Sequence, residues 1–130
     1  MATNPTSYPI RTAAAACGLT VHTLRWYERI GLLDRVPRGV DGRRRFGESD
    51  LDWLRFLVRL RGTGMPVAEM LRYAELARSG DESGERRLAL LLAHRERVAA
   101  NIAALKEHLE AVDYKIGIYR RTVRRQEEIA

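Results

Sequence analysis

The chain of 130 residues is 45% hydrophobic and 31% charged, a composition that excludes an intrinsically disordered protein. Its 23 basic and 17 acidic residues give a net charge of +6, which favours an acidic partner such as a nucleic acid. The single cysteine cannot form an internal disulfide, and neither an apolar run of ~20 residues nor a signal peptide is present, so we expect a cytoplasmic protein without membrane contact.

Two short helices are predicted near the N-terminus. The alanine-rich run 10–17 favours a helix because alanine has the highest helix propensity. Gly18 makes a turn, and Thr20 is a good N-cap for a second helix over 21–30, which Gly31 can end in the left-handed conformation. Two short helices joined by a tight turn form a helix-turn-helix, whose second helix is available to the DNA major groove.

The second predicted helix has one basic and aromatic face. An apolar stripe is expected to face the core, and the residues on the opposite face are His22, Arg25, Trp26 and Arg29. A short helix with cationic and aromatic side chains on its outer face suits a polyanion better than plain water. We therefore interpret this helix as the element around which the chain is organised.

An arginine-rich loop follows, and its sequence predicts a β-hairpin over residues 36–46. Asp41-Gly42 is a strong hairpin-turn signal. A hairpin after a helix-turn-helix is typical of a winged domain, and a solvated charged loop is the alternative. Because the loop directly follows a basic helix, we favour phosphate contacts by its arginines, which are Arg38, Arg43, Arg44 and Arg45.

Two further helices complete the predicted DNA-binding domain. Apolar residues at helical spacing predict a third helix over 48–61, and a fourth follows over 67–78. The polar stretch 79–84 is the best boundary in the chain, so we expect a domain over 1–78 and a linker over 79–84. Within that domain, residues 1–9 are expected to be a frayed tail.

One long helix over 85–126 is predicted to form a coiled coil. With Leu88 at heptad position a, most a and d positions are apolar or aromatic. The alternative is a helix folded back on its own domain, but so small a domain cannot cover this seam, so a second copy is the simplest partner. The predicted dimer interface comprises Leu88, Leu91, Val98, Ile102, Leu105, Leu109, Val112, Ile116 and Tyr119.

These motifs resemble the MerR family of bacterial transcription regulators. The family pattern T-L-R-Y-Y-[DE], followed by G-L-[LI], is similar to the run 23–28 with 31–33, and its wing pattern N-G-Y-R-x-Y is similar to 41–46. The closest resemblance is to the NmlR/AdhR-like branch, through Thr63-Gly64-Met65-Pro66, His94-Arg95, Asp113-Tyr114-Lys115-Ile116 and Tyr119.

The resemblance implies a fold and a mode of action. The expected fold is mainly α-helical, a winged helix-turn-helix with a small β-hairpin wing followed by a long dimerisation helix in an antiparallel coiled coil. The expected partners are a second copy of the chain, double-stranded promoter DNA at an inverted repeat, and RNA polymerase. Family members distort promoters whose two elements are spaced too far apart.

The resemblance also assigns roles to single residues. Arg25 and Tyr27 match positions that grip backbone phosphates, and Arg44 matches a wing contact. Arg61 matches a basic position that touches phosphate from the third helix. The candidates for contacts with base edges or thymine methyl groups are His22, Thr23 and Trp26.

Three positions depart from the family pattern. Trp26 replaces a tyrosine, which removes a hydroxyl acceptor but keeps a ring and one N–H donor. Arg43 replaces the wing tyrosine and exchanges stacking for charge, while Phe46 replaces another tyrosine and is expected in the core.

The sequence leaves the signal open. Metal-sensing relatives carry cysteines at the ends of the long helix, where this chain has none, and His94 and His108 make no plausible ligand set with Cys17. We therefore expect no metal. Arg59 occupies the position of the branch's suspected thiol sensor. We favour Cys17 as a buried packing residue, and a reactive thiol sensor is the alternative.

Two other functional classes are weighed against a DNA-binding regulator. A basic coiled-coil adaptor would hold another protein without sequence-specific DNA binding, but the wing arginines and the motif 23–27 argue against it. An enzyme would need a catalytic constellation, and no Ser/His/Asp, metal or glycine-rich phosphate pattern appears. We therefore expect no catalytic residues and no cofactor.

Overall fold

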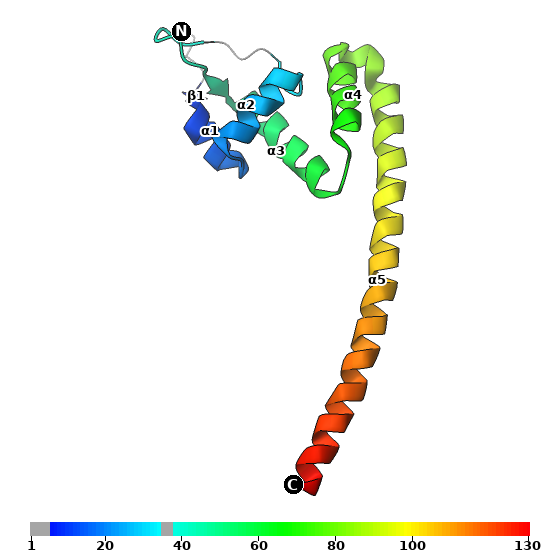
Figure 1. The fold of residues 1–130 in the computed structure, drawn as a ribbon. Helices are drawn as coiled ribbons and strands as arrows, with labels where there is room; N and C mark the ends of the chain where they lie inside the picture. Colours follow the sequence, from blue (N-terminus) through cyan, green and yellow to red (C-terminus); the bar gives the residue numbers. More distant parts are fainter. Residues whose placement is uncertain (1–5, 35–37) are drawn as a thin grey trace. The chain divides into compact units, whose positions relative to one another are not determined.

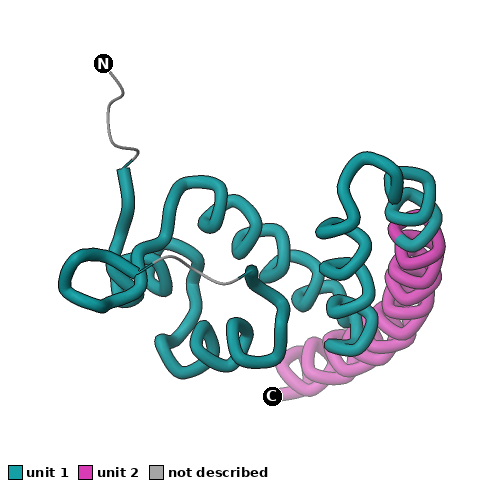
Figure 2. The backbone as a smooth tube through the Cα atoms, turned by 90° about the horizontal axis from the view of Figure 1, so that it is seen from above, with its two compact units in different colours: residues 1–90 teal, residues 91–130 magenta. Residues whose placement is uncertain are grey.

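The computed structural model describes residues 6–34 and 38–130, and most of them lie in helices (Figure 1). By contact the chain divides into two compact units, residues 1–90 and 91–130, which Figure 2 colours separately. The first unit contains β1 (Ser7–Tyr8), α1 (Ile10–Cys17), α2 (Val21–Ile30), β2 (Phe46–Gly47), α3 (Glu48–Gly62), α4 (Val67–Arg78) and the short 3-10 helix η1 (Gly80–Ser83). The last helix, α5 (Gly84–Ile129), makes up the second unit apart from its first turns.

The helical part of the predicted fold is confirmed. Helices α1, α2 and α4 have the predicted bounds, and α3 extends one residue further, to Gly62. The predicted linker 79–84 contains the C-cap of α4 (Ser79), all of η1 and the first residue of α5. The division into domains at this linker stays a prediction, because the two units defined by contact meet within α5.

Local signals fix both ends of α2. The Thr20 hydroxyl oxygen accepts a hydrogen bond from the Thr23 backbone N–H at 3.0 Å, so Thr20 satisfies one of the unpaired donors of the first turn. Gly31 ends the helix with φ of 94°, a left-handed conformation that costs a side-chain-bearing residue free energy. The length and position of α2 therefore follow from sequence next to its ends.

The expectation of a frayed tail over residues 1–9 is wrong for its second half, while residues 1–5 lie outside the described residues. Strand β1 pairs antiparallel with β2, with Ser7 opposite Gly47 and Tyr8 opposite Phe46. Side chains reinforce this pairing, since the Tyr8 hydroxyl donates to Glu48 at 2.5 Å. A strand of two residues has too few positions to show an alternating pattern, so only its distant partner reveals it.

The predicted wing is a small hairpin, of which positions 36 and 37 lie outside the described residues. Arg38 and Arg44 form an antiparallel bridge, and the Gly42 N–H closes a turn on the Gly39 carbonyl at 3.0 Å. The central residues of this turn are Val40 and Asp41, and Gly42 follows them with φ of 78°. The turn thus includes Asp41-Gly42 but is centred one residue earlier than a two-residue Asp-Gly turn, and Gly42 supplies the left-handed residue that follows it.

The core of the first unit lies where α3 packs against α1, α4 and β2. Phe46 is fully buried, which confirms its expected place in the core. The other large side chains with no appreciable exposure come from α2, the turn after it, α3, α4 and the α3–α4 connection, and they are Leu24, Leu32, Leu54, Leu57, Met65 and Met70. This core holds the helix-turn-helix and the base of the wing together.

Helix α5 exposes an apolar seam along its length. It has 46 residues, and Ile102, Leu105 and Leu109 are 49%, 66% and 58% exposed in the single chain. The other predicted seam residues that are exposed are Leu88, Val112, Ile116 and Tyr119, whereas Leu91 and Val98 are half-buried. Among the described residues, none of the helices has the length and apolar character required to cross a membrane.

Candidate nucleic-acid interface

The outer face of α2 carries the predicted base-reading side chains. His22, Arg25 and Trp26 are exposed, and the Trp26 ring lies 5.6 Å from that of Tyr27 in a tilted arrangement. Thr23 is half-buried, and its hydroxyl oxygen accepts a hydrogen bond from the Thr20 hydroxyl at 2.9 Å. The structure therefore leaves two of the three base-reading candidates, His22 and Trp26, open to a partner and engages the third, Thr23, in the helix cap.

Tyr27 belongs to the core more than to the surface. Its side chain is only 4% exposed, on the buried face of α2 with Leu24. A phosphate contact at this position stays a prediction, and the burial of the ring restricts such a contact to the phenolic hydroxyl. Tyr27 follows Leu24 by three residues, a spacing that puts both side chains on the same, buried face of the helix.

A basic groove lies between α1, α2 and the wing. Its volume is about 870 Å³, and the described residues that line it include five arginines and no acid: Pro9, Ile10, Arg11, Arg25, Arg38, Gly42, Arg43 and Arg44. Guanidinium groups form bidentate hydrogen bonds with phosphate oxygens, so the chemistry of this groove fits a nucleic-acid backbone. Arg25 belongs to α2, which we call the reading helix, so this helix forms one wall of the groove.

Arg11 is a groove residue that the sequence interpretation missed. It lies in the first turn of α1, whose N-cap is Pro9, and this helix end has no side-chain cap and no acid in its first turn. Backbone N–H groups at such an end carry partial positive charge and can bind an anion. The signal was present in the sequence as a basic residue two positions after Pro9, in the first turn of the predicted helix.

The wing arginines have different environments. Arg43 is exposed, while Arg38 donates from Nη1 to the Gly42 carbonyl at 2.7 Å and so stabilises the turn. Arg45 does not line the groove, because it donates to the backbone carbonyl of Ser7 at 2.8 Å and ties β1 to the wing. Arg44 forms an ion pair with Glu28 at 2.8 Å.

Arg61 lies apart from this groove, in the last turn of α3. Its Nη1 donates to the Met65 carbonyl at 3.1 Å, so the side chain covers the end of its own helix. Arg61 is nevertheless exposed. A phosphate contact by Arg61 stays a prediction, at a position separate from the wing and α2.

Cys17 has the environment of a packing residue. It is 7% exposed, and its thiol donates a weak hydrogen bond to the Leu51 carbonyl at 3.8 Å. Burial raises the pKa of the Cys17 thiol, and the charge of Arg55 lowers it to a smaller extent. Because the thiolate is the reactive form, this environment disfavours a thiol sensor. In the described part of the chain, no three His, Cys, Asp or Glu side chains are grouped as metal ligands would be.

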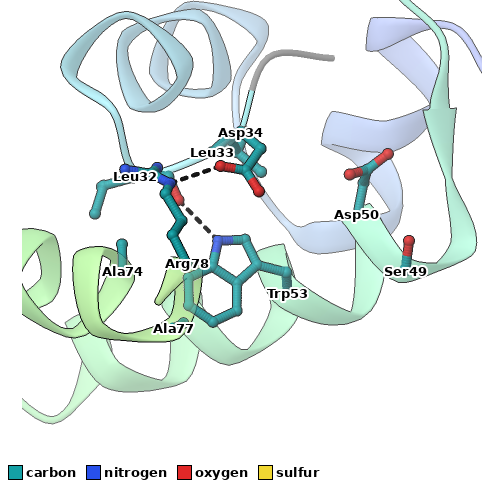
Figure 3. A pocket seen from close by; sticks show the side chains of 9 residues that line it. All are labelled: Leu32, Leu33, Asp34, Ser49, Asp50, Trp53, Ala74, Ala77 and Arg78. Carbon is teal, nitrogen blue, oxygen red and sulfur yellow. Dashed lines mark hydrogen bonds and ion pairs between the residues drawn. The ribbon is translucent and has the colours of Figure 1, made fainter. Parts of the chain in front are cut away.

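A second, smaller cavity of about 220 Å³ lies where α4 meets the end of α2 (Figure 3). The Trp53 indole N–H donates to the Leu32 carbonyl at 2.7 Å, and the ring stacks on Tyr73. Arg78 pairs with Asp34 at 2.6 Å and also donates to the carbonyl of Gly31, the C-cap of α2. The last turn of α4 is therefore tied to the end of the reading helix.

Comparisons with known proteins indicate the same class of protein as the geometry, a helix-turn-helix DNA-binding regulator. Residues 8–76 match the family model described as MerR HTH family regulatory protein, and residues 51–116 match the one described as MerR, DNA binding. The chain is 38% identical over 115 residues to an uncharacterized HTH-type transcriptional regulator from Haemophilus influenzae, and the match covers 88% of this chain and 85% of that protein. It is 36% identical over 89 residues to the HTH-type transcriptional regulator AdhR from Bacillus subtilis, which covers 68% of this chain and 64% of that protein.

Two solved structures are similar over nearly the whole chain. A MerR family transcriptional regulator from Listeria monocytogenes is 34% identical with a TM-score of 0.89, and the match covers 95% of this chain and 94% of that one. HiNmlR, described as a MerR family regulator lacking the sensor domain and bound to promoter DNA, is 38% identical with a TM-score of 0.82. That match covers 89% of this chain and 92% of HiNmlR.

Proposed function

Since the chain belongs to the MerR family of helix-turn-helix transcription regulators, we propose that it binds an inverted-repeat promoter site as a homodimer. The observation that carries this proposal is the groove with five arginines beside the exposed face of α2. The structure of HiNmlR on promoter DNA supports the same class of partner. Promoter DNA lies in the bacterial cytoplasm, so the protein acts there.

The apolar seam of α5 supports the homodimer. From Leu88 to Tyr119 the helix is about 48 Å long at ~1.5 Å per residue, and a second, antiparallel α5 has the matching length and pattern. Two copies related by a twofold axis present two reading helices, and an inverted repeat has the same symmetry. The dimer thus sets the spacing of the half-sites.

The exposed face of α2 makes the base contacts, and the arginines of the groove make the phosphate contacts. His22 and Trp26 contact base edges or thymine methyl groups, because they are exposed on α2 and can enter the major groove. Arg25, Arg38 and Arg43 contact backbone phosphates from the groove. Binding of this kind on a promoter with an overlong spacer distorts the DNA and presents it to RNA polymerase, as is typical of the family.

A salt titration of promoter binding tests the proposal. The dissociation constant is measured by fluorescence anisotropy on the protein's own promoter and on a scrambled duplex of the same length and composition. We expect tighter binding to the promoter and a linear log–log salt dependence with a slope of about −0.9 per phosphate contact. Equal affinity for both duplexes would refute sequence-specific regulation and favour the adaptor.

A variant of the reading helix sharpens this test. Trp26→Ala removes an exposed ring from the outer face of α2, so we expect reduced discrimination between promoter and scrambled duplex. Because tryptophan carries no charge, the salt slope should change little. Arg72→Ala is the matched control, because Arg72 is exposed on α4 away from the groove residues. Equal loss of discrimination in both variants would contradict a base-reading role for Trp26.

A further inference from the structure

Glu28 places an acidic side chain within a basic interface. It lies on α2 three residues after Arg25, which lines the groove, and its side chain is only 15% exposed. Its second carboxylate oxygen, Oε2, is buried and accepts no hydrogen bond from the described residues. A carboxylate in this position would repel a DNA phosphate unless a counter-charge lies close to it.

Arg44 supplies that counter-charge from the wing. Its buried Nε lies 2.8 Å from Glu28 Oε1, so the contact is an ion pair, although its geometry is not that of a hydrogen bond. The Arg44 side chain is 29% exposed. The two residues therefore form a partly buried ion pair that joins the hairpin to the reading helix. Arg43, the preceding wing residue, is exposed and has its backbone N–H bound to Asp41 at 3.0 Å.

We propose that Arg44 is a positioning residue: it neutralises Glu28 and holds the wing against α2, and it is not itself a phosphate contact. The proposal rests on the proposed function, because it takes the groove as the site of the DNA backbone. The pair fixes the separation between reading helix and wing before DNA arrives. Pre-organisation of this kind lowers the ordering cost of binding.

A double-mutant cycle on Glu28 and Arg44 tests the proposal through the dissociation constant for the protein's own promoter. Arg44→Gln leaves the Glu28 carboxylate without its counter-charge, so we expect affinity to fall by about tenfold or more. Glu28→Gln combined with Arg44→Gln removes both charges and leaves two amides that can hydrogen-bond to each other. We expect this double variant to bind within about threefold of the wild type.

A phosphate contact gives the opposite result. If the Arg44 guanidinium binds DNA directly, the double variant loses that contact too and binds as weakly as Arg44→Gln alone, which overturns the proposal. The matched control is Arg43→Gln, tested with and without Glu28→Gln. We expect Arg43→Gln to reduce affinity by the same factor in the wild-type background and in the Glu28→Gln background, because Arg43 does not pair with Glu28. Equal rescue of Arg43→Gln would identify a general charge effect and also overturn the proposal.

Amide hydrogen exchange in the free protein provides a readout that needs no DNA. The Gly39 N–H is bound to the Arg43 carbonyl at 2.7 Å and the Gly42 N–H to the Gly39 carbonyl at 3.0 Å, so both report on the wing. We expect faster exchange in Arg44→Gln and nearly wild-type exchange in the double variant. Unchanged exchange in Arg44→Gln overturns the proposal. A wild-type protein that binds promoter and scrambled duplex equally refutes the proposed function but leaves this readout of the wing intact.

Glu28→Gln by itself covers the case in which Arg44→Gln does not fold, as judged by circular dichroism. Removing the acid releases the Arg44 charge to the groove, so we expect the log–log salt slope to steepen by about 0.9. A slope equal to that of the wild type would overturn the proposal, because it would mean that Arg44 already contributes its full charge to the DNA.

Discussion

A charge placed in the apolar seam of α5 tests the dimer most directly. Leu105 is 66% exposed in the single chain, and we consider Leu105→Glu. Full burial of a leucine side chain is worth about 1.5–3 kcal/mol, so burying the exposed two thirds contributes about 1–2 kcal/mol per chain and about 2–4 kcal/mol per dimer. Loss of this term alone raises the dimer dissociation constant by about 30-fold to 1,000-fold, and burying an unpaired carboxylate adds to the effect.

Sedimentation velocity over a range of protein concentrations measures this change. The matched control is Ala103→Glu, which adds the same side chain at an exposed position two residues earlier, outside the a and d positions. Glutamate is a good helix former, so circular dichroism should show the helix intact in both variants. A Leu105→Glu variant that remains a dimer at wild-type concentrations, or an Ala103→Glu variant that dissociates equally, would refute the heptad assignment.

Three further predictions address the interface and its support. Arg43→Ala should weaken binding to promoter and scrambled DNA alike and reduce the salt slope by about 0.9, as measured by fluorescence anisotropy. A loss of affinity for the promoter alone would contradict a phosphate contact by Arg43. Thr20→Ala should lower the free energy of unfolding by about 1 kcal/mol in urea, because the Thr23 N–H loses its acceptor, while Thr20→Ser should stay near the wild type. Cys17 should react with a thiol reagent at pH 8 far more slowly in the native protein than in urea, because burial raises its pKa; rapid native modification, detected by mass spectrometry, would reopen the sensor hypothesis.

Features encoded by neighbouring residues were predictable. The bounds of α2 follow from Thr20 and Gly31, and those of α4 from Pro66 and the polar stretch after Arg78. The wing turn follows from Asp41-Gly42 in the same way. Each of these signals acts within a few residues of the element that it defines, so one sequence is enough to read it.

Features that depend on distant residues were not predictable. Strand β1 exists because Ser7–Tyr8 meets Phe46–Gly47, and the Arg45 side chain reaches Ser7 across the same distance in sequence. The Glu28–Arg44 pair and the place of Arg11 in the groove likewise require the fold. Composition shows how many arginines the wing carries, but only tertiary contacts show which of them remain available to DNA.

The exposed seam of α5 also makes the response of a promoter dependent on how much protein the cell holds. Where the dimer is the species that binds, and the monomer concentration lies below the dimer dissociation constant, the amount of dimer grows with the square of the monomer concentration. Halving the expression level then lowers the amount of dimer about fourfold. Through this one helix, a modest change in synthesis or turnover of the protein becomes a steeper change in operator occupancy, with no ligand involved.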